Sequence, residues 1–258
     1  MQRLSLGGGW KFHRVGARGS RPATVPGSVH ADLLALGAIE DPFFRENEKD
    51  LQWIGETDWR YWRDFRVGAS LLESDRVVLC CHGLDTLATI RINGKLVART
   101  DNMHRTWEFD VKRKLTVGRN RIEVTFASAA KEVRKRQKAD RLPGWFQMQC
   151  LEGASWLRKE ACNFGWDWGP GLVTCGIWRE IELVAFDSAR LADVRVSQDH
   201  SPSEGVAIAV HLRTERIATA ARSKLAATVT LLDGPDPVAR EWLRLPRGRG
   251  IATLRVED

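Results

Sequence analysis

The sequence predicts an all-β protein built from antiparallel β-sandwiches, and three observations support this. Short segments alternate between apolar and polar residues, as in Ala88–Asn93, where Ala88, Ile90 and Ile92 share one face. Turn-forming pairs separate these segments, and Asn93-Gly94 supplies the positive φ angles that a tight hairpin requires. Helical periodicity is confined to two short stretches. Short strands with frequent turns are typical of a sandwich rather than of a parallel α/β sheet.

Other segments show the same alternation and extend the predicted sheets. The apolar residues expected on buried strand faces are Trp59, Tyr61, Phe65 and Val67; Ile122, Val124 and Phe126; and Val206, Ile208, Val210 and Leu212. Leu225–Asp233 and Ile251–Val256 are two further candidate strands. Because side chains alternate between the two faces of a strand, each of these segments predicts one core-facing row.

Two short helices are predicted from their capping residues. Ser28 is placed to cap a helix that runs through Leu33 and Leu36, and Gly37 is placed to end it. Ser128 is placed to cap a basic helix from about Ala129 to Arg141, which Pro143-Gly144 ends.

The distribution of tryptophan indicates two domains. Of 11 tryptophans, only Trp242 follows Trp178, so the first part of the chain is rich in aromatic residues and the second is not. We expect a first β-sandwich domain at residues 1–187 and a second β-sandwich domain at residues 188–258. The second region shows only about four candidate strands, fewer than the seven of an immunoglobulin-type sandwich, so we expect it to be incomplete.

Composition and charge argue against nucleic-acid binding. The chain has 258 residues, of which 43% are hydrophobic and 28% charged, as in soluble globular proteins. The net charge is +7, but the segment Lys131–Arg141 holds six basic and two acidic residues and so supplies +4 of it. A solvated basic helix explains this excess better than a nucleic-acid surface does.

The cysteines and the N-terminus predict a cytoplasmic protein without a metal site. The five cysteines have no CxxC spacing, so free, mostly buried thiols in a reducing compartment are expected. They are Cys80, Cys81, Cys150, Cys162 and Cys175. The N-terminus has no apolar leader segment, and no stretch is long and apolar enough to span a membrane. No cofactor is indicated.

The common catalytic motifs are absent from the sequence. There is no GxSxG, HExxH or P-loop motif, and the six histidines are scattered. Paired carboxylates can hydrolyse glycosides, which makes Glu46-Asn47-Glu48, with Asp50, Glu56 and Asp58 downstream, a candidate. Charged residues outnumber apolar ones there, so a polar surface loop is the better interpretation.

The strongest local feature is the segment Asn163–Pro170, whose sequence is NFGWDWGP. Gly165 and Gly169-Pro170 interrupt regular structure on both sides, so Trp166-Asp167-Trp168 is expected in a constrained loop. A carboxylate between two indoles suits a sugar, whose C–H face packs on the rings while its hydroxyls donate to the carboxylate. The alternative is that both indoles belong to the core and Asp167 caps a turn; residue types alone leave both open.

Taken together, these motifs resemble the N-terminal region of the β-mannosidases of glycoside hydrolase family 2. The resemblance spans roughly residues 1–186. The matching segments are Pro26–Leu34, Gly37–Phe43, Asn47-Glu48, Trp53-Ile54, Asp58-Trp59, Gly83–Ala88, Asn93-Gly94, Asp101–His104, Leu157–Lys159, Phe164–Pro170 and Gly176–Arg179.

The resemblance implies a jelly-roll, galactose-binding-like domain, then an immunoglobulin-like domain, then a (β/α)8 barrel. In such enzymes two barrel glutamates release terminal β-linked mannose with retention of configuration. We therefore expect no catalytic residue in this chain, with the barrel following in cis. Asn47-Glu48 resembles the family's Asn-Glu acid/base pair, but the match places it in the first domain, so it is not catalytic.

The resemblance also implies substrate-binding residues in the loop. Asp167 is expected to accept hydrogen bonds from mannose hydroxyls, and Trp166 to close the far side of the terminal-sugar subsite. Trp168, Asn163 and Arg158 are weaker candidates, expected to support the loop. The expected ligands are β-mannoside oligosaccharides or glycan ends. The alternatives are a fragment of an exo-β-glucosaminidase of the same family and a free-standing carbohydrate-binding module.

Overall fold

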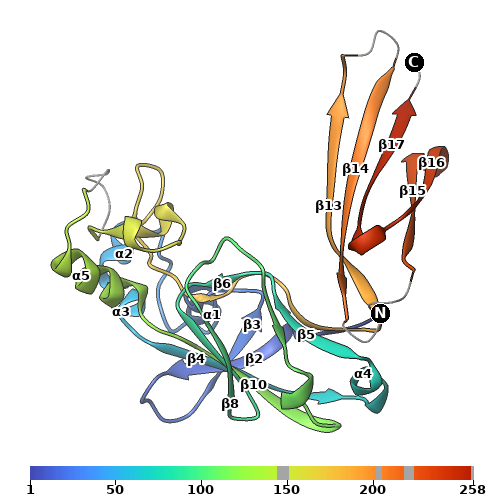
Figure 1. The fold of residues 1–258 in the computed structure, drawn as a ribbon. Helices are drawn as coiled ribbons and strands as arrows, with labels where there is room; N and C mark the ends of the chain where they lie inside the picture. Colours follow the sequence, from blue (N-terminus) through green and yellow to red (C-terminus); the bar gives the residue numbers. More distant parts are fainter. Residues whose placement is uncertain (144–150, 202–204, 218–223, 257–258) are drawn as a thin grey trace. The chain divides into compact units, whose positions relative to one another are not determined.

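The computed structural model describes residues 1–143, 151–201, 205–217 and 224–256. The chain divides into two compact units. The first comprises Gln2–Glu73 and Val77–Ala185, and the second comprises Met1, Ser74–Arg76 and Phe186–Asp258. Strands dominate both units (Figure 1), which confirms the all-β prediction. The predicted boundary between residues 187 and 188 stays a prediction.

The first unit is a sandwich whose larger sheet has six antiparallel strands in the order β3-β2-β4-β10-β7-β8. These strands are β2 (Gly8–Arg14), β3 (Arg21–Val25), β4 (Trp59–Val67), β7 (Ala88–Ile92), β8 (Lys95–Thr100) and β10 (Gly118–Phe126). Strand β10 lies in the middle, paired with β4 on one side and β7 on the other. Strands far apart in the sequence are therefore neighbours in the sheet.

The smaller sheet of the first unit has four strands in the order β1-β12-β5-β9. They are β1 (Gln2–Ser5), β5 (Arg76–Cys81), β9 (Trp107–Asp110) and β12 (Ile181–Phe186), and a two-stranded ribbon joins β6 (Leu84–Asp85) to β11 (Gly176–Ile177). Buried residues from both sheets form one hydrophobic cluster, which includes Phe12, Tyr61, Leu79, Phe126 and Leu183. Removing this apolar surface from water is the main stabilising contribution to the unit.

The predicted alternation is confirmed in this unit. Ile90 and Ile92 of β7 are fully buried, while Arg91 between them is exposed. Asn93 and Gly94 have φ angles of 51° and 75°, as the predicted hairpin turn between β7 and β8 requires. The predicted core rows of β4 and β10 are also buried.

Both predicted helices form. Helix α1 (Val29–Ala35) begins after Ser28, whose Oγ accepts a hydrogen bond from the Ala31 backbone N–H, and Gly37 follows it with φ of 60°. Helix α5 (Ala129–Ala139) begins after Ser128 and ends two residues before the predicted Arg141. It ends there because Asp140, a poor helix former, has an extended backbone. Gly144, part of the predicted stop signal, lies outside the described residues.

The remaining helices are short. They are α2 (Asn47–Asp50), α3 (Gln52–Gly55), α4 (Ala69–Glu73) and the 3₁₀ turns η1 (Lys112–Lys114), η2 (Ala154–Trp156), η3 (Ala161–Phe164) and η5 (Pro246–Gly248). Most lie in connections between strands, where they position loops rather than build the core.

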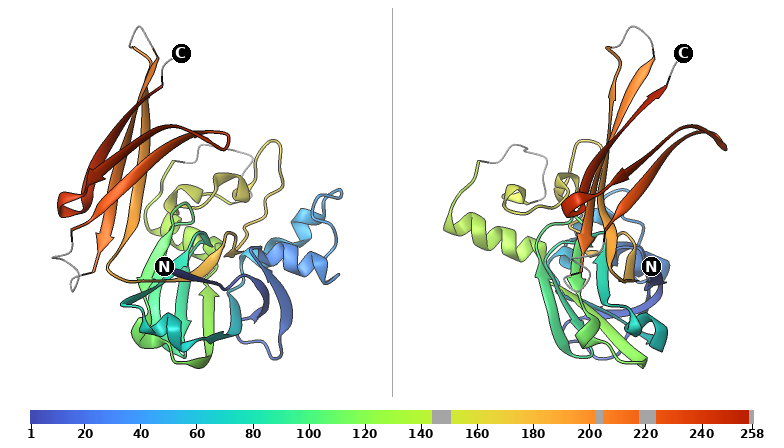
Figure 2. Two further views of the ribbon diagram at one scale, coloured as in Figure 1. Left: turned by 90° about the vertical axis from the view of Figure 1, so that its right-hand side faces the viewer. Right: turned by 45° about the vertical axis from the view of Figure 1, so that its right-hand side comes forward.

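The second unit packs a three-stranded sheet, β13 (Ala189–Asp199), β14 (Val206–Arg216) and β17 (Arg249–Val256), beside a hairpin of β15 (Ala226–Asp233) and β16 (Asp236–Arg244). Figure 2 shows this hairpin, in red, beside the sheet, and apolar residues from both share one cluster. The described part of this unit thus holds five strands, so the count of about four was too low. Two strands were not predicted. A bulge at Leu191/Asp193 breaks the alternation of β13, and β16 begins at Asp236-Pro237, a pair typical of loops.

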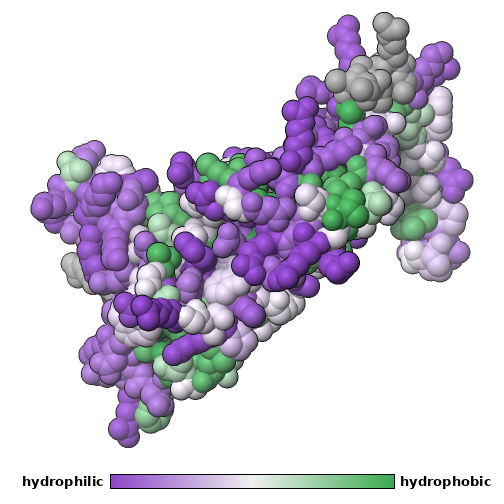
Figure 3. All heavy atoms as spheres, turned by 90° about the horizontal axis from the view of Figure 1, so that it is seen from below, coloured by the Kyte–Doolittle hydropathy of each residue, from purple (hydrophilic) through white to green (hydrophobic). Residues whose placement is uncertain are grey.

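The described cysteines are free thiols. Cys80, Cys81 and Cys175 are buried, whereas Cys162 is only partly so; Cys150 lies outside the described residues. Burial raises the pKa of the Cys81 and Cys175 thiols, which keeps them protonated. Among the described residues there is no cluster of potential metal ligands and no helix with the length and apolarity to cross a membrane. Hydrophilic residues cover most of the face drawn in Figure 3.

Candidate functional site

The loop that carries the Trp-Asp-Trp motif is supported by a small hydrophobic cluster of its own. Phe164 is fully buried and clusters with Leu157, Val173 and the α5 residues Ala130 and Val133. Polar contacts join the same elements. The Trp156 Nε1–H donates to Gln137 Oε1 at 2.8 Å, and the Arg136 guanidinium donates to the Trp156 carbonyl at 3.1 Å. The basic helix therefore serves as the base on which the loop rests.

The motif itself forms a tight two-residue turn. The Trp166 N–H donates to the Gly169 carbonyl at 3.2 Å, and the Gly169 N–H donates back to the Trp166 carbonyl at 3.3 Å. Gly165, with φ of 98°, turns the chain into this hairpin after η3, in a conformation that a side chain would strain. Asp167 and Trp168 occupy the tip.

The two indoles lie near each other, and Asp167, which stands between them in the sequence, is exposed. Their ring centroids lie 6.2 Å apart at an interplanar angle of 43°. Trp168 is 71% exposed, Asp167 is exposed and Trp166 is partly buried. The alternative in which both indoles belong to the core is therefore wrong. A ring face and a carboxylate that both remain open to solvent can contact the C–H face and the hydroxyls of one sugar.

Two short helices, α2 through Glu48 and α3 through Gln52, hold the residue that follows the loop. A Glu48 carboxylate oxygen accepts the Gly171 N–H at 2.9 Å, and Gln52 Nε2 donates to the Gly171 carbonyl at 2.7 Å. This corrects the interpretation of Glu46–Glu48 as a simple surface loop. Residues 47–50 form one helical turn, and Glu48 is partly buried because it binds a backbone amide 123 residues away.

Three other carboxylates of this segment also have partners. Glu46 pairs with Lys49 at 2.8 Å, and Glu56 pairs with Arg134 of α5 at 2.6 Å. Asp58 accepts the Ser128 N–H at 2.8 Å, beside the cap of α5. That Asn47-Glu48 is not catalytic stays a prediction.

A buried ion pair lies beneath the loop. The Lys159 ammonium is 2.6 Å and 2.5 Å from the two carboxylate oxygens of Asp85, and it also donates to the Thr174 carbonyl at 3.0 Å. The side chains of Lys159 and Asp85 are 0% and 4% exposed. This pair was not predicted, although both residues lie in the matching motifs. No local pattern in the sequence indicated it.

His30 of α1 is buried close to this ion pair. Burial, followed by the positive charge of Lys159, lowers the pKa of His30 to about 4, while the charge of Asp85 acts in the opposite direction. The imidazole is therefore neutral at physiological pH, and its Nδ1 has no hydrogen-bond partner among the residues that the structure describes.

The two weaker candidates in this segment differ in position. Asn163 Oδ1 lies 3.2 Å from the Thr174 hydroxyl, which in turn lies 2.6 Å from Asp85, so Asn163 joins the network beneath the loop. Arg158 has an exposed side chain, and its carbonyl accepts the Met103 N–H at 2.9 Å. Asn163, Asp85 and Trp178 also line a cavity of about 290 Å³.

A two-sheet jelly roll that displays an exposed aromatic and acidic loop defines a galactose-binding-like class of domain. The sequence profile described as "Glycosyl hydrolase 2 galactose-binding domain-like" matches residues 10–179. The chain belongs to this family, glycoside hydrolase family 2.

Within this family, the chain is similar to proteins named β-mannosidases. Beta-mannosidase B of Emericella nidulans is 33% identical over 98% of this chain and 30% of its own length. The beta-mannosidase of Capra hircus is 34% identical over 73% of this chain and 22% of its own length. The crystal structure of a β-D-mannosidase from Dictyoglomus thermophilum is 36% identical and superposes with a TM-score of 0.84, over 99% of this chain and 31% of that one.

These comparisons confirm the predicted resemblance and the predicted pair of sandwich folds. The chain spans less than a third of the length of the relatives named above. The substrate-binding roles assigned to Trp166, Asp167, Trp168, Asn163 and Arg158 stay predictions.

Proposed function

We propose that this chain serves as the N-terminal, non-catalytic portion of a retaining exo-β-mannosidase that hydrolyses terminal, non-reducing β-D-mannose residues. Two lines support this. Proteins named β-mannosidases match at 33–36% identity over nearly the whole chain, and the loop has a geometry suited to a sugar.

The observation that carries the proposal is the exposed Asp167 on a tethered turn that also holds two neighbouring indoles, Trp166 and Trp168. We assign Asp167 to accept hydrogen bonds from mannose hydroxyls remote from the scissile bond. Trp166 walls off the same subsite, so that only a chain terminus fits. Gly171, Glu48 and the buried pair beneath the loop keep the tip in position, and such positioning contributes to the rate as well as to binding.

Hydrolysis itself belongs to the barrel that we propose in cis. Retention requires two carboxyl groups about 5–5.5 Å apart, one as nucleophile and one as acid/base. Of the candidate carboxylates in the first unit, Glu46 and Glu56 pair with cations, and Glu48 and Asp58 accept backbone amides. We expect the 258-residue chain alone to hydrolyse no aryl β-mannoside and to bind mannosides with a Kd of roughly millimolar, since half of the subsite is missing.

In the full-length enzyme, Asp167→Ala should lower kcat/KM for an aryl β-mannoside by about tenfold or more, equivalent to about 1.4 kcal/mol. The reason is that hydrogen bonds that hold the sugar for reaction are lost. Steady-state kinetics measures this. Glu73→Ala, an exposed carboxylate at the end of α4, is the control and should leave the kinetics unchanged. Wild-type kinetics in a folded Asp167→Ala enzyme would refute the assignment.

Two other functions predict different results. An exo-β-glucosaminidase would prefer an aryl β-glucosaminide over the mannoside; the exo-chitosanase of Amycolatopsis orientalis, at 18% identity and a TM-score of 0.66, shares the fold alone. A free-standing binding module would bind oligosaccharides tightly without any barrel. The higher identity to β-mannosidases favours the mannoside.

A further inference from the structure

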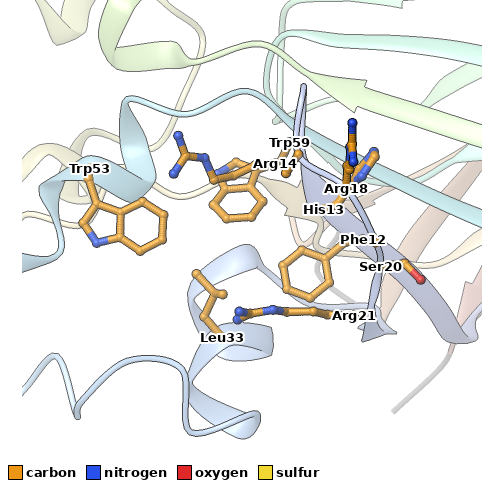
Figure 4. A pocket seen from close by; sticks show the side chains of 11 residues that line it. Phe12, His13, Arg14, Arg18, Ser20, Arg21, Leu33, Trp53 and Trp59 are labelled. Atoms are coloured by element: carbon orange, nitrogen blue, oxygen red, sulfur yellow. The ribbon is translucent and has the colours of Figure 1, made fainter.

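A second concave site lies in the first unit, lined by residues of β2, the following loop, α1 and α3. Its volume is about 260 Å³. Phe12, Leu33 and Trp59 form an apolar floor and are almost completely buried. Trp53, which is 40% exposed, supplies a wall (Figure 4). None of these residues belongs to the Trp-Asp-Trp loop.

The rim of this pocket is strongly basic. Arg14, Arg18 and Arg21 line it, and no Asp or Glu is among its lining residues. Figure 4 shows the side chain of Arg14 extended toward Trp53 and that of Arg21 extended toward Leu33; the Arg14 guanidinium lies 6.0 Å from the centre of the Trp53 ring. Within the described ranges, no ion pair engages any of these three arginines.

Two acidic side chains of the nearby segment already have other partners. Asp58 accepts the Ser128 N–H, and Glu56 pairs with Arg134. Among the described residues, neither buried ring nitrogen of His13, which also contributes to the lining, has a hydrogen-bond partner.

We propose that this pocket binds an acidic monosaccharide unit, meaning a pyranose that carries a carboxylate or a phosphate. The C–H face of the ring packs on Trp53 and the apolar floor, and the anion takes a charge-assisted, bidentate hydrogen bond from Arg14, while Arg21 adds positive charge at another part of the rim. The volume is slightly below the range of about 300–1,000 Å³ typical of drug-sized ligands, which suits a single sugar ring. This site does not depend on the proposed function of the loop.

A simpler explanation is that the arginine stems merely cover apolar surface while their charged ends stay in water. That explanation predicts no saturable binding. It also predicts that removing the charges of two pocket arginines weakens ligand binding no more than removing any other two surface charges does. The two explanations therefore differ in a measurable way.

The experiment is calorimetric titration of the 258-residue chain with glucuronate, mannose 6-phosphate, mannose and inorganic phosphate. We expect saturable binding of at least one acidic sugar with a Kd of roughly millimolar. Mannose and inorganic phosphate should each bind about tenfold more weakly than the acidic sugar. Mannose lacks the anion, and inorganic phosphate lacks the sugar ring. Comparison of the two acidic sugars tells whether a carboxylate or a phosphate is the preferred anion.

Two matched double variants complete the test. Arg14→Gln/Arg21→Gln should weaken binding of the acidic sugar by about tenfold or more. Arg66→Gln/Arg113→Gln removes two exposed arginines outside the pocket lining and should leave binding within about twofold. Circular dichroism verifies that both variants are folded. Absence of saturable binding, equal affinity for inorganic phosphate, or equal losses in the two variants would each overturn the proposal.

Discussion

At the scale of single residues, Lys159 and Asp85 show how a charge is kept inside this fold. Desolvation of each ion costs several kcal/mol, and their attraction offsets this only when the geometry is good and the remaining hydrogen-bonding groups are satisfied. Here the ammonium contacts both carboxylate oxygens and the Thr174 carbonyl, and the Thr174 hydroxyl supports the carboxylate. The pair links the ribbon strand β6 to the loop segment and so fixes the base of the candidate site.

His30 predicts a pH dependence of stability. Its folded-state pKa of about 4 lies below the ordinary value of 6.5, so between these values the unfolded chain binds more protons than the folded one. Stability should therefore fall as the pH falls from about 6.5 toward 4 and level off below that. The total loss should be roughly 3 kcal/mol, since one pKa unit corresponds to about 1.4 kcal/mol.

Urea unfolding of the wild type and of His30→Gln between pH 4 and pH 7 measures this contribution. The difference between the two proteins isolates the histidine from the carboxylates that titrate in the same range. The variant should show a shallower decline of stability with falling pH. Parallel curves for the two proteins would show that the buried imidazole does not titrate as proposed.

At the scale of elements, α2 is too short to be stable by itself, and its role is to hold the loop through Glu48. Glu48 and Gln52 together hold both backbone groups of Gly171, two residues after the motif's last glycine. The opposite end of the loop rests on α5 through the cluster around Phe164. A turn of four residues is thus fixed from two sides by helices from distant parts of the chain.

Glu48→Gln should loosen this tether. A charge-assisted hydrogen bond to a backbone N–H contributes about 1.5–3 kcal/mol, and the neutral amide retains only part of it. We expect a loss of about 1 kcal/mol in stability and faster amide hydrogen exchange around Gly171. Glu46→Gln, in the same segment but in a fully exposed pair with Lys49, should leave stability unchanged because solvent screens that pair. Equal exchange rates near Gly171 in the two variants would contradict the role of Glu48.

At the scale of the whole molecule, the buried apolar residues fall into separate clusters. The large cluster lies between the two sheets of the first unit, and another lies within the second unit. The second cluster has fewer fully buried residues, and several strand residues of this unit, such as Val194 and Ile251, remain about half exposed. We infer that the second unit has the smaller hydrophobic stabilisation.

Substitutions in the two clusters should act separately. Ile122→Ala, in the first unit, and Ile208→Ala, in the second, should each cost about 2–5 kcal/mol because each leaves a cavity. Hydrogen exchange followed by mass spectrometry should show lost protection mainly in the unit that carries the substitution. Loss spread over both units after either substitution would show that they unfold as one.

The features predicted correctly from the sequence were local ones. The rows of β4, β7 and β10, the Asn93-Gly94 turn and the caps at Ser28 and Ser128 all depend on residues within a few positions of one another. Two strands were not predicted because their local pattern is interrupted. A bulge breaks the alternation of β13, and Pro237 near the start of β16 suggests a loop. The constrained loop at Trp166–Gly169 was predicted because its glycines mark it in the sequence.

The sequence by itself therefore determined the fold class, the family resemblance and the position of the Trp-Asp-Trp loop. Backbone preference and side-chain alternation depend on residues that are close together in the sequence. Only the tertiary structure decided how that loop is held. The Lys159–Asp85 pair joins residues 74 positions apart, and the Glu48–Gly171 bond joins residues 123 apart. Contacts at such separations follow from the packing of whole sheets, so no local pattern reveals which lysine is buried or which glutamate binds a backbone amide.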